Sequence, residues 1–247
     1  MIFKMNTTPK PIEMVALQLP FKERYQKNFD VLLEHLEENR HRHIVLTPEV
    51  FLTGFDYEHL LTASKFSANA LKTLKKTVNE QIVVLTLILE DGDAFVNQAV
   101  VIHKHKIIHR QNKVKLFRLG DEDLYFHAGK TKKIKPFEIE GLKYAILICF
   151  ELRFKALWSQ IEGADIVLIP SRWGKTRKSH LEILSRALAV MNQCYVVVAN
   201  GGDEDMAKAS AIINPFGKFV QNDKQEKIKA KIDFREIKKM RRYIVMD

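Results

Sequence analysis

Short apolar runs alternate with segments of helical periodicity along the first half of the chain. Residues 14–19 form an apolar run of strand length, and residues 43–47 form a second one. Between them, the segment 24–39 places apolar side chains at the spacing of one helix face: Phe29, Leu32, Leu33 and Leu36. The pattern predicts a strand, a helix and a strand in succession, which together form a βαβ unit.

Three further strands are predicted after a second helix near residues 66–80. The apolar runs at 81–89, 94–102 and 106–109 are rich in Val and Ile, which favour strands. An Asp-Gly-Asp sequence at 91–93 separates the first two runs and is typical of a hairpin turn. We therefore expect these three strands to lie next to one another.

The second half of the chain repeats this style without a fixed sequence period. It predicts the following elements in order: strand 142–149, helix 153–162, strand 166–169, helix 179–193, strand 195–199, and short strands at 209–213 and 219–221. Two βαβ-like halves predict an α/β protein folded as an αββα sandwich. No Pro- or Ser-rich linker divides the halves, so we expect one domain over residues 1–247. The charged tail, residues 227–247, can pack against this domain as an arm.

The composition agrees with a globular protein that has a full core. Of 247 residues, 46% are hydrophobic and 28% are charged, with only 10 Gly and 7 Pro. This composition excludes a linker-like or disordered chain.

The two cysteines, Cys149 and Cys194, lie in apolar runs and cannot build a disulfide framework. Free thiols persist in a reducing compartment, so we expect a cytoplasmic location. No apolar run approaches the ~20 residues that span a bilayer, so neither a membrane span nor a signal peptide is expected.

The net charge of +10 raises the question of a nucleic-acid partner, because clustered Lys and Arg side chains neutralise phosphates. The basic residues are instead spread over four segments, at 103–118, 130–135, 172–178 and 224–242. The chain has neither zinc-finger spacing nor the aromatic signature of an RNA-binding sheet. Solvated basic faces are the commoner explanation of such charge, so we expect neither a nucleic acid nor a membrane as a partner. A non-catalytic basic binding protein stays the alternative.

Cys149 stands where a predicted strand changes into a polar helix start. The apolar run 144–148 ends at this residue, and the charged residues Glu151 and Arg153 follow. A thiol at the carboxyl end of a strand lies where open α/β sheets bind their ligands. A helix N-terminus lowers the pKa of a thiol because it stabilises the thiolate. Cys149 is therefore a candidate nucleophile, and an inert cysteine of the core is the alternative.

Two carboxylates and a lysine also follow predicted strands. Glu49 comes after the strand at 43–47 and has the chemistry of a general base toward a thiol, although a solvated or helix-capping Glu is the alternative. Lys113 and Glu122 follow the strand at 106–109, where a plain charged loop is the alternative. No paired spacing of Cys, His or carboxylates marks a metal site. Gly-x-Ser-x-Gly, Walker and dinucleotide-binding motifs are absent from the sequence.

Three motifs follow one another along the chain: Pro48-Glu49, Asn112-Lys113-Val114-Lys115-Leu116-Phe117, and Ile148-Cys149-Phe150-Glu151-Leu152-Arg153-Phe154. With them, the chain resembles the nitrilase superfamily of carbon–nitrogen hydrolases, whose Glu-Lys-Cys triad is matched by Glu49, Lys113 and Cys149. Further positions extend the likeness over nearly the whole chain: Gln18, Glu122, Tyr125, Phe126, Gly129, 163–170, Trp173, Arg186, Ala187, Asn192, Gln193, Asn200, Ser210 and 214–217.

The resemblance implies an αββα sandwich of the nitrilase type and thiol-dependent cleavage of a non-peptide C–N bond. Glu49 would take the proton from Cys149, and the thiolate would attack an amide, carbamoyl or nitrile carbon. Ammonia or an amine would then leave, and water activated by Glu49 would hydrolyse the thioester. Lys113 and the backbone N–H of Phe150 would stabilise the oxyanion, with Glu122 in support. The resemblance implies neither a metal nor an organic cofactor.

The resemblance also implies assembly as a homodimer or a higher homo-oligomer. The subunits would pack through helices near the nucleophile, for which 153–162 and 179–193 are the candidates.

The chain departs from the family pattern at two places. The sequence Arg-Phe-Lys-Ala at 153–156 replaces the common Arg-Phe-Pro-Glu, and Met191 replaces an acid. The second change removes a salt-bridge partner, so no subfamily's pocket is carried over to this chain.

The candidate substrate contacts are Tyr125, Arg172 and Trp173. The loop after the strand at 166–169 should overhang Cys149, and in it basic residues surround the tryptophan: Arg172, Lys175, Arg177 and Lys178. A guanidinium pairs bidentately with a carboxylate. We therefore expect a small amide or carbamoyl substrate that bears a carboxylate. A solvated basic loop is the alternative for these residues, and nitrile hydrolysis by the same triad is the alternative reaction.

Overall fold

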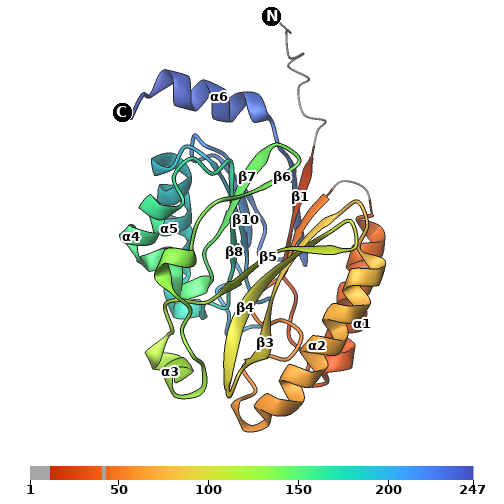
Figure 1. Cartoon of the computed structure of the whole chain (residues 1–247). Helices are drawn as coiled ribbons and strands as arrows, with labels where there is room; N and C mark the ends of the chain where they lie inside the picture. The colour runs from red at the N-terminus through yellow and green to blue at the C-terminus, as the bar shows by residue number, and fades with distance from the viewer. Residues whose placement is uncertain (1–11, 41–42, 247) are drawn as a thin grey trace, which may run out of the picture.

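Two six-stranded sheets pack face to face and carry helices on both outer sides (Figure 1). The computed structural model describes residues 12–40 and 43–246. The strand order is β12-β1-β2-β3-β4-β5 in the first sheet and β11-β10-β9-β8-β7-β6 in the second. The predicted α/β class and αββα sandwich are confirmed.

The first sheet and its helices come from the first half of the chain, with one strand added from the C-terminal part. Their bounds are β1 Glu13–Leu17, α1 Tyr25–Glu38, β2 His43–Leu46, α2 Leu60–Thr77, β3 Ile82–Asp91, β4 Ala94–His103, β5 Lys106–Asn112 and β12 Lys227–Lys231. Strands β1, β2 and β3 are parallel, whereas β4 is antiparallel to β3 and β5 is antiparallel to β4. The carboxyl ends of β2 and β5 therefore lie at the same edge of this sheet.

The second sheet comes from the second half of the chain. Its elements are β6 Phe137–Ile139, β7 Leu142–Ile146, α4 Lys155–Gln160, β8 Ile166–Pro170, α5 Lys178–Met191, β9 Tyr195–Ala199, β10 Ala211–Ile213 and β11 Phe219–Gln221. Strands β7, β8 and β9 are parallel. A short helix, α3 Glu122–Tyr125, lies at the opposite end of the molecule from α6 Phe234–Tyr243 (Figure 1). Among the described residues, no helix combines the length and the apolar character needed to cross a membrane.

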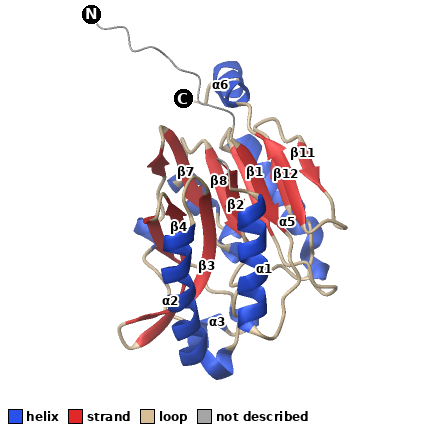
Figure 2. Ribbon diagram, turned by 90° about the vertical axis from the view of Figure 1, so that its right-hand side faces the viewer, coloured by secondary structure: helices blue, strands red, loops and turns tan. Residues whose placement is uncertain are grey.

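Successive side chains of a strand alternate between the two faces of the sheet, and both faces are covered. In β1, Met14 and Ala16 belong to the apolar layer between the sheets, whereas Val15 and Leu17 pack in the layer that contains Leu32 of α1. Figure 2 shows α1 and α2 lying along the outer face of this sheet. Central strands such as β3, β8 and β9 meet almost no water on either face and are nearly continuous apolar runs, which is why the sequence revealed them.

The boundary between β7 and α4 differs from its prediction for a local reason. Strand β7 ends at Ile146, and a 3-10 helix, η4 Cys149–Arg153, replaces the end of the predicted strand and the start of the predicted helix. Helix α4 begins only at Lys155. Cys149 has a φ of 49°, in the left-handed region, so the chain turns sharply although the apolar run continues.

The charged tail forms part of the fold instead of an appended arm. Strand β12 pairs antiparallel with β1, from Glu13 opposite Lys231 to Leu17 opposite Lys227. Helix α6 then buries an apolar face made of Phe234, Ile237 and Met240. The strand escaped prediction because its three lysines suit the solvated edge of a sheet, where charged side chains prevent further pairing.

We predict that Gly202→Ala destabilises the fold, because the loop after β9 touches the backbone that follows β1. The N–H of Gly202 donates to the carbonyl of Leu19 at 2.9 Å, and an added Cβ would lie 2.4 Å from the carbonyl oxygen of Gln18. Relieving such a contact requires the backbone to move, so the free energy of unfolding should fall by about 1–3 kcal/mol.

Urea unfolding of this variant and of Gly120→Ala tests the prediction. A Cβ at Gly120 would meet only the side chain of Phe117, which can shift. Equal stability of Gly202→Ala and the wild type would contradict the close approach.

Candidate active site

The carboxyl ends of four strands bring the predicted site residues together. Glu49 follows β2 and Lys113 follows β5 in the first sheet, whereas Cys149 follows β7 and Arg172 follows β8 in the second. The two sheets meet directly here, because the backbone N–H of Glu49 donates to the carbonyl of Ser171 at 3.1 Å. The site therefore lies where the edges of the two sheets face each other.

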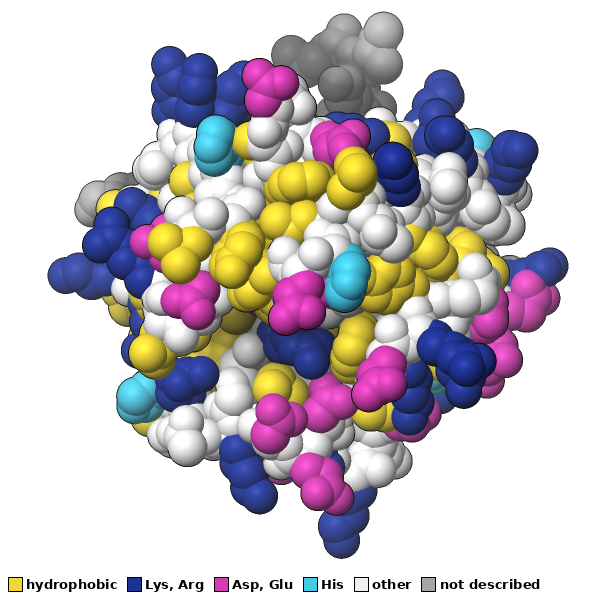
Figure 3. All heavy atoms as spheres, turned by 90° about the horizontal axis from the view of Figure 1, so that it is seen from below, with side chains coloured by type: hydrophobic (Ala, Val, Ile, Leu, Met, Phe, Trp, Pro, Cys, Tyr) yellow, Lys and Arg dark blue, Asp and Glu magenta, His cyan; other side chains and the backbone are white. Residues whose placement is uncertain are grey.

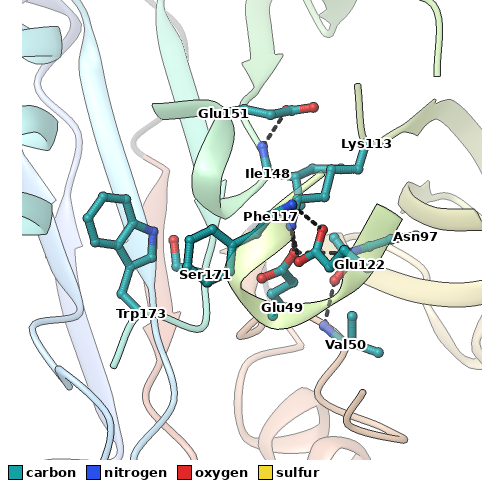
Figure 4. A network of polar contacts seen from close by, with 12 residues as sticks. Glu49, Val50, Asn97, Lys113, Phe117, Glu122, Ile148, Glu151, Ser171 and Trp173 are labelled. Carbon is teal, nitrogen blue, oxygen red and sulfur yellow. Dashed lines mark hydrogen bonds and ion pairs between the residues drawn. The ribbon is translucent and has the colours of Figure 1, made fainter. Parts of the chain in front are cut away.

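The Lys113 ammonium lies between two carboxylates (Figure 4). Its Nζ is 2.7 Å from Oε1 of Glu49 and 2.6 Å from Oε1 of Glu122, and all three side chains are buried. Burial by itself would lower the pKa of Lys113, but the charges of Glu49 and Glu122 raise it above the ordinary value. Lys113 is therefore a fixed positive charge. Two of its three donor hydrogens point at these carboxylates, which leaves one for a further acceptor.

Side chains from two strands orient the segment that carries Glu49. Nδ2 of Asn97, in β4, donates to Oε1 of Glu49 at 2.8 Å, and the N–H of Val50 donates to Oγ1 of Thr86, in β3, at 2.6 Å. Sequence reasoning missed both Asn97 and Thr86. Each is a polar residue within an otherwise apolar run, and such an interruption is the signal that would have indicated them.

Glu122 begins helix α3 and completes the cluster. Its second oxygen, Oε2, accepts a hydrogen bond from the N–H of Phe117 at 3.1 Å. Burial and the charge of Glu49 raise the pKa of Glu122 to about 7, although Lys113 acts in the opposite direction. Glu122 therefore holds a proton more readily than an exposed carboxyl group does, whereas the ammonium beside it stays charged.

Cys149 is buried and lines a cavity of about 210 Å³. Burial and the charge of Glu49 raise the pKa of its thiol well above the ordinary value, although Lys113 and a hydrogen bond from the backbone of Arg172 favour the thiolate. The predicted lowering by a helix N-terminus is wrong. The element η4 is a 3-10 helix of only five residues, and loss of solvent is the largest influence on the thiol.

The cavity beside Cys149 is lined by aromatic and basic side chains. Besides Cys149, its walls are formed by Phe117, Leu119, Phe150, Arg153, Arg172, Trp173 and Arg177. Within the part of the chain that the structure describes, no group accepts a hydrogen bond from the backbone N–H of Phe150 or from the indole N–H of Trp173. Neither donor is thus used within the described structure, although the indole nitrogen of Trp173 is itself buried.

Two of the three cavity arginines have no carboxylate partner among the described residues. Arg153 lies over the ring of Trp173, with its guanidinium carbon 4.6 Å from the ring centroid, and Arg177 lies over another aromatic ring. Arg172 is 3.9 Å from Asp203, a distance at the limit of an ion pair. The arginines of the cavity wall suit an anionic ligand. Figure 3 views the molecule from the end where α3 lies, where basic, acidic and apolar side chains all reach the surface.

Two other side chains that were predicted near the substrate lie elsewhere. Tyr125 is exposed and stacks on Tyr57, with ring centroids 4.2 Å apart, and it is not part of the cavity wall. Lys178 forms an ion pair with Asp223. Arg172 and Trp173 are the predicted substrate contacts that the structure brings to the cavity.

The arrangement contains the groups that acyl transfer requires. A thiol lines the cavity, a carboxylate lies close enough to perturb it, and an ammonium with an unused donor lies beside that carboxylate. A weak nucleophile needs a base, and the oxyanion of a tetrahedral intermediate needs a fixed positive donor. Both needs are met by buried groups at strand ends.

Comparison with known proteins agrees with this fold. The family model described as carbon–nitrogen hydrolase matches residues 15–242. In structure, the chain is similar to a Saccharomyces cerevisiae member of branch 10 of the nitrilase superfamily, with a TM-score of 0.79, 22% identity, and coverage of 96% of this chain and 95% of that one. At this identity the likeness establishes the fold alone.

Two sequence relatives are amidases by name. The chain is 30% identical over 222 residues to a 2-oxoglutaramate amidase of Bacillus subtilis, covering 84% of this chain and 85% of the relative. It is 28% identical over 202 residues to an omega-amidase of Escherichia coli, covering 78% of this chain and 76% of the relative. With the family model matched over nearly its whole length, this chain belongs to the carbon–nitrogen hydrolase family.

Proposed function

We propose that this enzyme hydrolyses the amide of a small carboxylate-bearing substrate through a thioester on Cys149 and releases ammonia. The observation that carries the proposal is the position of Cys149. Its thiol lines the cavity, and the charges of Glu49 and Lys113 act on it from the buried cluster. The names of the two sequence relatives support an amide as the bond that is cleaved.

In the first half-reaction, Glu49 takes the proton of Cys149 as the sulfur attacks the amide carbon. The carbonyl electrons move to the oxygen, and this oxyanion accepts hydrogen bonds from the free donor of Lys113 and from the backbone N–H of Phe150. When the tetrahedral intermediate collapses, the C–N bond breaks and Glu49 gives its proton to the leaving nitrogen. Ammonia leaves, and the acyl group stays on the sulfur as a thioester.

In the second half-reaction, water takes the place of ammonia. Glu49 removes a proton from this water as its oxygen attacks the thioester carbon, and the same donors stabilise the second oxyanion. The C–S bond then breaks, and the departing sulfur takes the proton from Glu49. The net change converts one amide and one water into a carboxylic acid and ammonia, and it restores the resting enzyme.

Glu122 supports this cycle without contact with the reacting carbon. It shares the Lys113 ammonium with Glu49 at 2.6 Å and is itself held by the N–H of Phe117. The ammonium is thereby directed and kept charged while Glu49 gains and loses its proton. A cation that stayed paired only with Glu49 would move with each change in the charge of that residue.

The cavity arginines indicate the substrate class. Arg153 and Arg177 face the cavity without a carboxylate partner among the described residues, and a guanidinium pairs in bidentate fashion with a carboxylate. The cavity of about 210 Å³ suits a small molecule. A monoamide of a dicarboxylic acid satisfies both features, with its amide at Cys149 and its carboxylate at the arginines. The proposed substrate is therefore an ω-amide.

A cytoplasmic location and a homodimer belong to this proposal as well. The location rests on the two free buried thiols. On α5 the apolar side chains of Ile183, Val190 and Met191 are exposed, and such a patch suits a second copy of the chain. Leu157 of α4 is instead buried within its own subunit, so the helix predicted at 179–193 is the better candidate for the interface.

The two cysteines provide a matched test of the thiol mechanism. We expect Cys149→Ala to lower ammonia release by more than about 10³-fold, because the nucleophile is lost. Cys194→Ala removes the other buried thiol and should leave ammonia release nearly unchanged. The measurement is ammonia release from a panel of ω-amides, simple amides, N-carbamoyl compounds and nitriles. Equal turnover by Cys149→Ala and the wild type would exclude the thioester. If the wild type released ammonia from nitriles alone, the substrate would be a nitrile and not an amide.

The carboxylate specificity is tested at Arg177. We expect Arg177→Ala to lower kcat/KM for glutaramate by about 10- to 100-fold, because a hydrogen-bonded charge pair is lost. For pentanamide, which has the same chain length and no carboxylate, kcat/KM should change little. Arg172→Ala is the comparison variant, and its effect should be smaller because Arg172 already faces Asp203. An equal loss of kcat/KM for glutaramate and for pentanamide would show that Arg177 does not bind the substrate carboxylate.

The thiol pKa predicts how Cys149 reacts with iodoacetamide at different pH values. A raised pKa means that the neutral thiol persists to higher pH, so the thiolate fraction is still rising above pH 7. In the Cys194→Ala background, which leaves Cys149 as the single thiol, the alkylation rate should rise about tenfold per pH unit between pH 6 and 9 without a plateau. A plateau below pH 8 would indicate a thiolate that exists before substrate binds and would contradict this resting state.

A further inference from the structure

Glu151 is a buried carboxylate that the mechanism above does not use. Its side chain is fully buried, and within the described residues it forms no ion pair with Lys, Arg or His. Its two oxygens instead accept hydrogen bonds from backbone N–H groups. Oε1 accepts from Val114 at 2.6 Å. Oε2 accepts from Ile148 at 2.7 Å (Figure 4). A buried charge of this kind is retained only when its hydrogen bonds are satisfied.

The two N–H groups belong to the immediate neighbours of Lys113 and Cys149. Val114 follows Lys113 at the end of β5, in the first sheet, and Ile148 precedes Cys149 after β7, in the second. One carboxylate therefore joins the backbone beside the ammonium to the backbone beside the thiol.

The backbone of Lys113 is held on its other sides as well. Its N–H donates to the carbonyl of Asn97 at 2.8 Å, and its carbonyl accepts from the N–H of Gly129 at 2.8 Å. Cys149 itself is held at a φ of 49°, a conformation that most residues avoid. The surrounding contacts must keep the thiol in this position, because the local backbone preference does not.

We propose that Glu151 is a positioning residue that fixes the separation between the Cys149 thiol and the Lys113 ammonium. The proposal rests on the function proposed above, in which the thiol forms the bond to the amide carbon and the ammonium receives the oxyanion. The two groups come from different sheets, so a small slide of one sheet against the other would separate them. A displacement of about 1 Å at such a site can cost about 100-fold in rate.

The ionised form of Glu151 is the one that serves this purpose. A carboxylate offers an acceptor at each oxygen, whereas a carboxylic acid or a carboxamide has a donor on one side. That donor would face the N–H of Val114 or of Ile148. Burial raises the pKa of Glu151 to about 7, although both N–H groups and Lys113 act in the opposite direction. Both hydrogen bonds are therefore complete only when the carboxyl group has lost its proton.

Glu151→Gln tests the proposal, because it keeps the shape of the side chain and removes one acceptor. We expect kcat for the ω-amide to fall about 10- to 100-fold with KM within about threefold of the wild type, since the loss concerns the chemical step. The control is Gln81→Leu. The amide of Gln81 is buried and donates to the carbonyl of Leu36 at 2.7 Å, far from the site. This variant should lose stability and keep kcat.

A second readout is independent of catalysis. Amide hydrogen exchange in the native protein should show protection at Val114 and Ile148, and Glu151→Gln should lose protection at these two positions more than elsewhere. If Glu151→Gln fails to fold, Glu151→Asp keeps the charge but is one methylene too short to reach both N–H groups, and it should show the same loss of kcat.

The outcomes separate this proposal from the proposed function. Unchanged kcat in Glu151→Gln, or a loss equal to that of Gln81→Leu at equal loss of stability, would overturn the positioning role. Rapid exchange of both amides in the wild type would overturn it as well. A wild-type enzyme that hydrolyses no amide would refute the proposed function, and the exchange of Val114 and Ile148 would still decide whether Glu151 joins the two strand ends.

Discussion

The contact between the Lys113 ammonium and the carboxylates of Glu49 and Glu122 is the constraint on which the rest of the site depends. Three ionisable side chains are removed from water here, and that is favourable only when each charge has close partners. The amide of Asn97 and the N–H of Phe117 supply the remaining hydrogen bonds. Every member must therefore sit at a fixed place, which strand ends provide better than mobile loops do.

The thiol joins this cluster from the other sheet, so the reaction geometry depends on how the two sheets pack. The apolar layer between them restricts how the sheets approach, but apolar contacts alone tolerate small slides. Directional contacts remove that freedom. The N–H of Glu49 donates to the carbonyl of Ser171 on one side of the junction, and Glu151 joins the segments beside Lys113 and Cys149 on the other. The polar contacts at the junction thus fix the relative position of the two sheets, which burial of apolar surface alone does not fix.

Much of this could be read from the sequence, because the central strands are buried on both faces and appear as apolar runs. Glu49 and Cys149 could be found since each follows such a run, whereas Lys113 follows β5, a strand with partly exposed side chains. Asn97 and Thr86 are visible as polar interruptions of apolar runs, but their partners are not, because a polar residue inside a strand gains its partner only through the register of neighbouring strands. The thiol pKa was predicted with the wrong sign for a related reason. The polar helix start after the strand is visible in the sequence, whereas the burial that raises the thiol pKa arises from both sheets together.

The raised thiol pKa clarifies how the proton of Cys149 would move. When both carboxylates of the cluster are ionised, Glu49, Glu122 and Lys113 together carry one negative charge. Loss of the thiol proton to solvent would add a second negative charge to the same buried volume, which desolvation opposes. Transfer of that proton to Glu49 leaves the total charge unchanged. The environment that makes a free thiolate costly therefore favours transfer within the cluster, timed with attack on the substrate. The resting enzyme on this view holds a thiol, and its reactivity depends on the position of Glu49.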